Sequence, residues 1–375
     1  MAQRTAVSSW VQLFNRNLKA FTRQTQRAQT QATRAVVQRA STAKKPPATP
    51  GDWLSGMALG PGGARRYRLY RPPELQAGER LPLLVMLHGC GQDAASFALS
   101  TRMNALAKRE RFLVLYPEQD RLASAQRCWN WYDTRSGRAH GEVGLILAAI
   151  DQVCLLQPVD RSCVAIAGLS AGASMAALIA SRHPARFKAV VMHSGVAPGA
   201  ADSTATALAA MRGHRLSAPW SPLPGQLLPL PPLLVIQGTR DAVVAASNGA
   251  AAAGVWALAG GAVAGEPRSQ QRGQRHPMQV TDFKLRGRTA ATLINVDHLG
   301  HAWSGGATQQ PFSDAQGPDA SRMVWAFVSR HFPSTPRVPA APGVRPRPAA
   351  QTAFNIPLLF NPFALTTLKG ATLKP

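Results

Sequence analysis

A short segment around Ser170 most constrains what this chain can fold into. Val164–Ala167 is an apolar run typical of a buried strand, and it leads through Gly168-Leu169-Ser170-Ala171-Gly172 into helix-forming residues that stop at His183-Pro184. The two glycines allow a sharp turn between strand and helix, and such a turn exposes the serine hydroxyl. The motif alone is common by chance, but this context predicts a nucleophile at Ser170 rather than a structural serine in a glycine turn.

A serine nucleophile needs a histidine to accept its proton and a carboxylate to orient that histidine. When the nucleophilic serine lies in a strand–turn–helix segment of this kind, the acid and then the histidine follow later in the chain, each on a loop after a strand. The apolar run Pro232–Gly238 ends just before Asp241. Asp241 is therefore the expected acid, and the alternative is an Asp that forms a turn or caps a helix.

The histidine is harder to choose, because both His298 and His301 follow the apolar run Ala290–Val296. Spacing alone does not decide between them. Glycine at 300 and the pair Gly305-Gly306 give His301 the exposed loop that a catalytic imidazole needs, which favours His301 over a polar His298 near the strand end.

Two backbone N–H groups are needed to stabilise an oxyanion. The first is expected from Ala171, at the positive end of the helix after the nucleophile. The second is expected from the loop after the apolar run Leu83–Leu87, with Cys90 preferred over Gly91. His88 in that loop is interpreted as a bracing residue rather than a base.

The wider pattern alternates strands with helices and predicts an α/β fold, a mostly parallel sheet with helices on both faces. The expected strands are 66–70, 83–87, 113–116, 164–167, 189–193, 233–237 and 289–296, and the expected helices are 102–109, 142–156, 171–182, 247–259 and 320–330. No Cys-x-x-Cys pair or His/Cys cluster at zinc spacing occurs, so the expected chemistry uses no metal and no cofactor.

Five segments together resemble the esterases of the poly(3-hydroxybutyrate) depolymerase family, which are close to bacterial feruloyl and acetylxylan esterases. They are 87–92, Arg127-Cys128-Trp129-Asn130-Trp131-Tyr132, 168–172, Gly238-Thr239-Arg240-Asp241 and Gly300-His301-Ala302-Trp303-Ser304-Gly305-Gly306. The resemblance implies an α/β-hydrolase fold and a serine esterase in which Ser170, Asp241 and His301 form the triad. It implies hydrolysis of hydroxyalkanoate polyesters or oligomers, with feruloyl or acetylxylan esters as the alternative.

Two departures from the family pattern limit what carries over. Arg240 precedes the acid, where it alters the local electric field, and Gly213–Leu230 forms an extra Pro- and Leu-rich loop. This loop is interpreted as a lid or a substrate wall, so acyl preference is not transferred.

The four cysteines, and the tryptophans of the motif loops, each allow two interpretations. Family cysteines imply a Cys90–Cys128 bond, a Cys154–Cys163 bond is a further option, and reduced buried thiols are the alternative for both. Trp129 and Trp303 are expected to bind substrate, and the alternative is that they only pack the loops.

The two ends of the chain are basic and contain no Asp or Glu. Residues 1–51 carry nine Lys/Arg and residues 334–375 carry five, together 14 of the net +24. We expect a basic amphipathic N-terminal helix with a linker (1–51), the esterase domain (52–333) and a Pro-rich disordered tail (334–375).

Three roles compete for residues 1–43: docking on the catalytic domain, binding an anionic membrane or polyester-granule surface, and, least favoured, binding nucleic acid. A hypothesis of another class makes the whole chain a basic surface-binding protein on a hydrolase scaffold. No signal peptide is readable, so an extracellular or periplasmic location rests on the resemblance, with the cytoplasm as the alternative.

Overall fold

The computed structural model describes residues 49–215 and 229–333. The predictions for residues 1–48, for the tail 334–375 and for most of the loop Gly213–Leu230 lie outside the described residues. Within them, the first strand begins at Asp52 and the last helix ends at Ser329.

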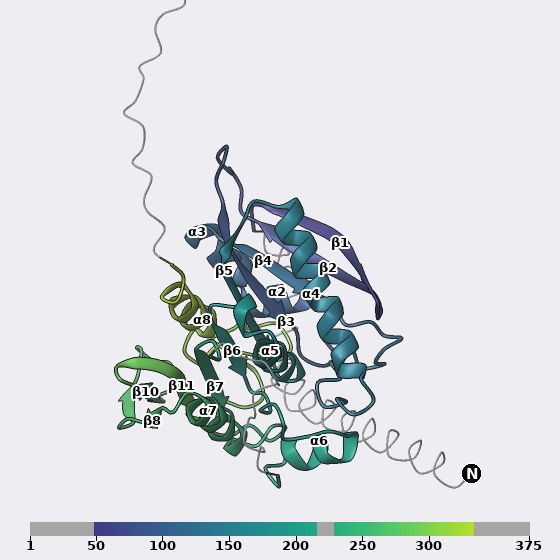
Figure 1. Cartoon of the computed structure of the whole chain (residues 1–375). Helices are drawn as coiled ribbons and strands as arrows, with labels where there is room; N and C mark the ends of the chain where they lie inside the picture. The colour runs from purple at the N-terminus through teal and green to yellow at the C-terminus, as the bar shows by residue number, and fades with distance from the viewer. Residues whose placement is uncertain (1–48, 216–228, 334–375) are drawn as a thin grey trace, which may run out of the picture. The chain divides into compact units, whose positions relative to one another are not determined.

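One large mixed sheet organises the described residues (Figure 1). Its central strands run parallel in the order β4-β3-β5-β6-β7-β11, with antiparallel β2 and β1 at one edge and β10 with β8 and β9 at the other. The strands are β1 (Asp52–Gly60), β2 (Gly63–Arg71), β3 (Leu81–Leu87), β4 (Leu113–Pro117), β5 (Val159–Leu169), β6 (Val190–His193), β7 (Leu233–Gly238), β8 (Val263–Ala264), β9 (Arg268–Gln270), β10 (Met278–Leu285) and β11 (Arg288–Val296); β12 (Trp303–Ser304) and β13 (Ser313–Asp314) pair separately.

Helices cover both faces of the sheet. Figure 1 shows α4, α5 and α7 on the face nearer the viewer, and their apolar residues share one core cluster, whereas those of α2, α3 and α8 lie in a second. The helices are α2 (Ala94–Thr101), α3 (Met103–Glu110), α4 (Arg138–Leu156), α5 (Ala171–Arg182), α6 (Thr204–Met211), α7 (Ser247–Ala259) and α8 (Ala320–Ser329).

The sequence of β3 explains why two cores form. Successive side chains of a strand point to opposite faces. Leu83, Val85 and Leu87 therefore enter the first cluster, while Leu84 and Met86 enter the second. A strand buried on both faces is apolar without interruption, as expected in a parallel sheet covered on both sides.

The fold prediction is confirmed, and each expected strand and helix is present with shifts at its ends. The sequence prediction missed β1 and β10, whose outward positions are polar or exposed. It also missed the short strands β8, β9, β12 and β13 and the short helices α2 and α6. Among the described residues, α4 is long and apolar enough to cross a membrane; half of it is buried, as in the core helix of a globular domain. No metal-binding group of three His, Cys, Asp or Glu side chains occurs in the same part of the chain.

Candidate active site

The predicted serine elbow is a strained turn between β5 and α5. Ser170 has φ of 56° and ψ of −122°, a backbone conformation that residues other than glycine rarely adopt. Its N–H donates to the carbonyl of His193 at 2.8 Å, and its carbonyl accepts the Ser174 N–H at 3.1 Å. These two bonds hold the strained residue between a neighbouring strand and the first turn of α5.

Close packing explains why both motif glycines are needed. A Cβ at Gly168 would lie 2.3 Å from the carbonyl carbon of Gly172, and a Cβ at Gly172 would lie 2.2 Å from the carbonyl oxygen of Leu87. Helix α5 can therefore approach the ends of β5 and β3 only if these two positions lack side chains.

Ser170, His301 and Asp241 form a continuous chain of hydrogen bonds. His301 Nε2 lies 2.9 Å from Ser170 Oγ, and His301 Nδ1 lies 2.8 Å from Asp241 Oδ2. Because the carboxylate can only accept, Nδ1 carries the proton and Nε2 is left to accept from the serine hydroxyl. This is the tautomer that a general base for Ser170 requires.

Asp241 is buried and well supplied with donors. Its Oδ1 accepts the N–H groups of Val243 at 3.0 Å and Val244 at 2.9 Å, and its Oδ2 also receives Gln237 Nε2 at 3.3 Å. Burial acts to raise the pKa of Asp241, but His301 and the two backbone donors outweigh it and hold this pKa below its ordinary value. The carboxylate therefore stays charged where it can orient and stabilise an imidazolium.

The loops that carry the acid and the histidine are bonded to each other. Arg240 N–H donates to the Leu299 carbonyl at 3.0 Å, and His298 N–H donates to Thr239 Oγ1 at 3.1 Å. Gly238 permits this approach, since a Cβ there would lie 2.3 Å from the Leu299 oxygen. His298 is itself exposed and has φ of 61°, so it is the turn residue of this contact, and His301 is the one that faces Ser170.

His193, which the sequence reading passed over, connects the elbow to the histidine loop. Its carbonyl holds Ser170, its Nε2 accepts the Ser304 N–H at 3.1 Å, and its ring stacks on Trp303 with centroids 5.0 Å apart. Burial and the nearby His301 lower the pKa of His193 to about 3, so the ring is neutral and keeps Nε2 free to accept.

The predicted oxyanion loop is held at Cys90 and at Gly91. A disulfide joins Cys90 to Cys128, and the Gly91 N–H donates to the Gln126 carbonyl at 2.7 Å. Gly91 therefore already uses its donor. The structure gives the Cys90 N–H no bond to another described residue, and Ala171 as the first residue of α5 has no acceptor in its own helix.

His88 braces this loop. Its Nε2 accepts the Gln119 N–H at 3.1 Å and its Nδ1 donates to the Gly89 carbonyl at 2.8 Å, while burial lowers its pKa to about 4. The His88 carbonyl in turn accepts Trp129 Nε1 at 2.9 Å.

Glu142 of α4, a second residue without a sequence signal, anchors the neighbouring loop. Its buried carboxylate accepts the backbone N–H of Asn130 at 2.9 Å and the side-chain amides of Asn130 and Gln119, each at 2.6 Å. The segment after Cys128 is thus held by one buried acceptor.

The two tryptophans expected to bind substrate have no exposed surface. Trp129 donates to His88, as above, and Trp303 Nε1 donates to Ser321 Oγ at 3.1 Å. Their position corresponds to the alternative of loop packing. Cys154 and Cys163 are free, buried thiols, so of the two suggested pairs only Cys90–Cys128 forms a disulfide in the described residues.

Comparison with known families agrees with the motifs. Residues 65–269, more than half of the chain, match the model of the family described as esterase PHB depolymerase. The chain belongs to this family. The predicted family is therefore confirmed, and the matched region contains Ser170 and Asp241 but ends before His301.

The curated relatives of this chain are named for different ester substrates. Poly(3-hydroxyalkanoate) depolymerase C of Paucimonas lemoignei is 30% identical over 203 residues, which is 52% of this chain and 48% of the relative. Feruloyl esterase B of Neurospora crassa is 32% identical over 146 residues, covering 37% and 48%. The chain thus spans about half the length of these curated relatives.

Among solved structures, an acetyl xylan esterase from Aspergillus awamori superposes with a TM-score of 0.58 at 17% identity. The superposition covers 74% of this chain and 100% of that one. At this identity the likeness shows the α/β-hydrolase fold alone.

Proposed function

We propose that this esterase-family protein is a metal-independent carboxylic ester hydrolase that works through an acyl-serine intermediate. The observation that carries the proposal is the hydrogen-bonded chain from Ser170 through His301 to the buried Asp241. A structural serine in a glycine turn needs no imidazole at 2.9 Å, nor a carboxylate behind that imidazole.

In the first half of the reaction, Ser170 Oγ attacks the ester carbonyl while its proton passes to His301 Nε2. Asp241 stabilises the imidazolium that forms. The Cys90 and Ala171 N–H groups donate to the oxyanion of the tetrahedral intermediate, a contribution worth about 3–4 kcal/mol for each donor in related sites. His301 then protonates the leaving alkoxide, and the alcohol departs.

In the second half, water replaces the alcohol. His301 takes a proton from the water, whose oxygen attacks the acyl carbon, and the second tetrahedral intermediate collapses to the free acid. The proton returns from His301 to Ser170 Oγ. The cycle needs no group beyond this chain and water.

For the substrate, we favour oligomers or polymers of 3-hydroxyalkanoates, since a relative that is 30% identical over 203 residues carries the name of a polyhydroxyalkanoate depolymerase. Feruloyl or acetylxylan esters are the second candidate, supported by relatives with those names. The Cys90–Cys128 disulfide favours an oxidising compartment, extracellular or periplasmic.

The test is an activity profile with a matched inactive control. The wild-type protein and Ser170→Ala are assayed with p-nitrophenyl butyrate, a 3-hydroxybutyrate trimer, methyl ferulate and acetylated xylan, and circular dichroism verifies the fold of both. We expect turnover of the trimer by the wild type and loss of all ester hydrolysis in the variant. Wild-type activity on ferulate or xylan alone would select the second candidate, and activity retained by Ser170→Ala would refute the mechanism.

For the basic segment 1–43 we propose binding to an anionic membrane or polyester-granule surface, with residues 52–333 as the catalytic unit. A chain that begins at residue 51 should keep its esterase activity and lose salt-sensitive binding to anionic vesicles or granules. If the wild-type chain binds anionic and neutral surfaces equally, this role is wrong.

A further inference from the structure

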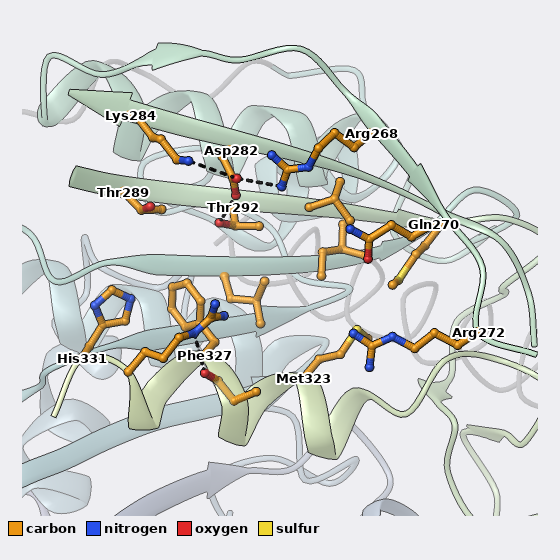
Figure 2. Close-up of a pocket in the computed structure, with 16 residues that line it drawn as sticks. Arg268, Gln270, Arg272, Asp282, Lys284, Thr289, Thr292, Met323, Phe327 and His331 are labelled. Carbon is orange, nitrogen blue, oxygen red and sulfur yellow. Dashed lines mark hydrogen bonds and ion pairs between the residues drawn. The ribbon is translucent and has the colours of Figure 1, made fainter. Parts of the chain in front are cut away.

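A groove lies between helix α8 and the sheet extension formed by β9, β10 and β11 (Figure 2). Its volume is about 420 Å³, within the range of about 300–1,000 Å³ that is usual for small-molecule sites. None of the triad or oxyanion residues lines it. Its lining includes Leu234, near the start of β7, whereas Asp241 follows the far end of that strand, so the groove is separate from the active site.

The floor of the groove is apolar. It is made of side chains from three strands and from α8 that are almost completely buried: Leu234, Met278, Val280, Ile294, Met323 and Phe327. These side chains offer no hydrogen-bond donor. The part of a ligand that rests on them must be apolar, because a polar group placed there without a partner costs about 1–3 kcal/mol.

The rim of the groove is cationic. Arg268, Arg272, Lys284 and Arg330 line it, with Asp282 as the one acidic side chain of the lining. The Asp282 carboxylate already has partners within the protein. It accepts hydrogen bonds from the Arg268 guanidinium and from Thr292 Oγ1, each at 2.8 Å, and Lys284 Nζ lies 3.6 Å away (Figure 2). Burial acts to raise the pKa of Asp282, but these contacts outweigh it and hold the pKa below its ordinary value. The carboxylate therefore remains charged, and its charge is balanced by Arg268 and Lys284.

Two guanidinium groups of the rim are not neutralised. Arg272 and Arg330 form no ion pair with any residue of the described ranges, and Arg330 uses only its Nε, which donates to the Ala326 carbonyl at 2.8 Å. A guanidinium offers paired donors that match a carboxylate. Each of these two guanidinium groups is thus free to bind a small anion at the rim, above an apolar floor.

We propose that this groove binds a medium-chain aliphatic carboxylate, with its chain along β10 and α8 and its carboxylate at Arg272 or at Arg330, the two guanidinium groups of the rim without an ion pair. A plain fatty carboxylate fits better than a hydroxyalkanoate oligomer, since ester carbonyls that lie over the apolar floor would have no donor there. The site goes beyond the proposed ester hydrolysis and does not depend on it.

The experiment is isothermal titration of the full chain with decanoate at low ionic strength, with 1-decanol, decylammonium and the 3-hydroxybutyrate trimer as comparison ligands. Decanoate should bind at least about tenfold more tightly than the other three.

The variants test which residues bind decanoate. Arg272→Ala/Arg330→Ala should weaken decanoate binding by at least about tenfold, and Ala326→Trp should block it by filling the groove without changing a charge. The control Arg109→Ala/Arg322→Ala removes two exposed arginines that do not line the groove and should bind as the wild type does.

Turnover of p-nitrophenyl butyrate should be the same in all of these variants, so the result is independent of the proposed hydrolysis. The proposal is overturned if Arg272→Ala/Arg330→Ala binds decanoate as the wild type does, or if the control variant loses as much affinity. It is equally overturned if decanol or the trimer binds as tightly as decanoate.

Discussion

The active-site edge of the sheet and the groove beside α8 hold their charged groups in opposite ways. The Asp241 side chain has no exposed surface and that of His301 is 10% exposed, whereas Arg268 and Lys284 on the groove rim are about half exposed. At the active site, backbone N–H groups and neutral side chains fix the geometry. At the groove, solvated cations surround an apolar floor. We therefore expect small changes to abolish catalysis, and binding in the groove to weaken gradually with substitution and salt.

The largest expected effect is that of Asp241→Asn. The amide keeps the size of the side chain but can stabilise His301 in the wrong tautomer, so kcat should fall by about 10⁴-fold. Decanoate binding should not change. The measurement is steady-state kinetics with p-nitrophenyl butyrate beside calorimetry with decanoate, and a loss of less than about tenfold in kcat would contradict the assigned role.

The next effect is that of the Cys90–Cys128 disulfide, which closes a loop with a sequence separation of 38. Replacing both cysteines by alanine should lower the free energy of unfolding by about 4 kcal/mol and reduce activity, because the oxyanion loop loses its tie. Cys154→Ala, at a free buried thiol, is the control and should cost about 1 kcal/mol. Urea unfolding measures both. Equal losses of unfolding free energy in the two variants would show that the disulfide stabilises the protein no more than an ordinary buried side chain does.

A third effect separates two glycines by their surroundings. Gly172→Ala places a Cβ 2.2 Å from a backbone oxygen and should destabilise the protein by about 3 kcal/mol or more, with loss of esterase activity. Gly254→Ala in α7 meets nothing within 4 Å and should leave stability unchanged or raise it by up to about 1 kcal/mol. Thermal unfolding of the two variants decides, and a stable, active Gly172→Ala would show that the elbow tolerates a looser fit.

The smallest effect is a pH dependence of stability. His88 has a pKa of about 4 in the folded protein against the ordinary 6.5, so the unfolded chain binds more protons between these values. Stability should therefore fall as the pH drops from 6.5 to 4, by about 3 kcal/mol from this residue. In His88→Gln the slope should be shallower, and in the control His214→Gln, an exposed residue, unchanged. Urea unfolding across this range tests the sign, and a slope unaffected by His88→Gln would contradict it.

The features that the sequence revealed are local. Ser170 was predictable because strand, glycines and helix adjoin it in the chain, and Asp241 because parallel strands gather function at their carboxyl ends. His301 was distinguishable from His298 only weakly in the sequence. The structure separates them because His298 is used in the turn that contacts Thr239.

The features that the sequence did not reveal depend on contacts between distant segments. His193 and Glu142 look like ordinary strand and helix residues, and only the fold brings them to Ser304 and Asn130. The groove escaped notice because β9 and β10 carry too many polar residues to resemble strands, so the neighbourhood of Arg272 could not be foreseen.

The central claim is that Ser170 is a nucleophile activated by His301. Diisopropyl fluorophosphate, followed by peptide mass spectrometry, tests it most directly, because the reagent phosphorylates an activated serine far faster than an ordinary one and the mass spectrum identifies the labelled residue. We expect stoichiometric labelling of Ser170 in the folded protein, none in Ser170→Ala, and labelling in His301→Gln that is at least about 10³-fold slower. A folded wild-type protein that remains unlabelled at Ser170, or is labelled as fast without His301, would contradict the account.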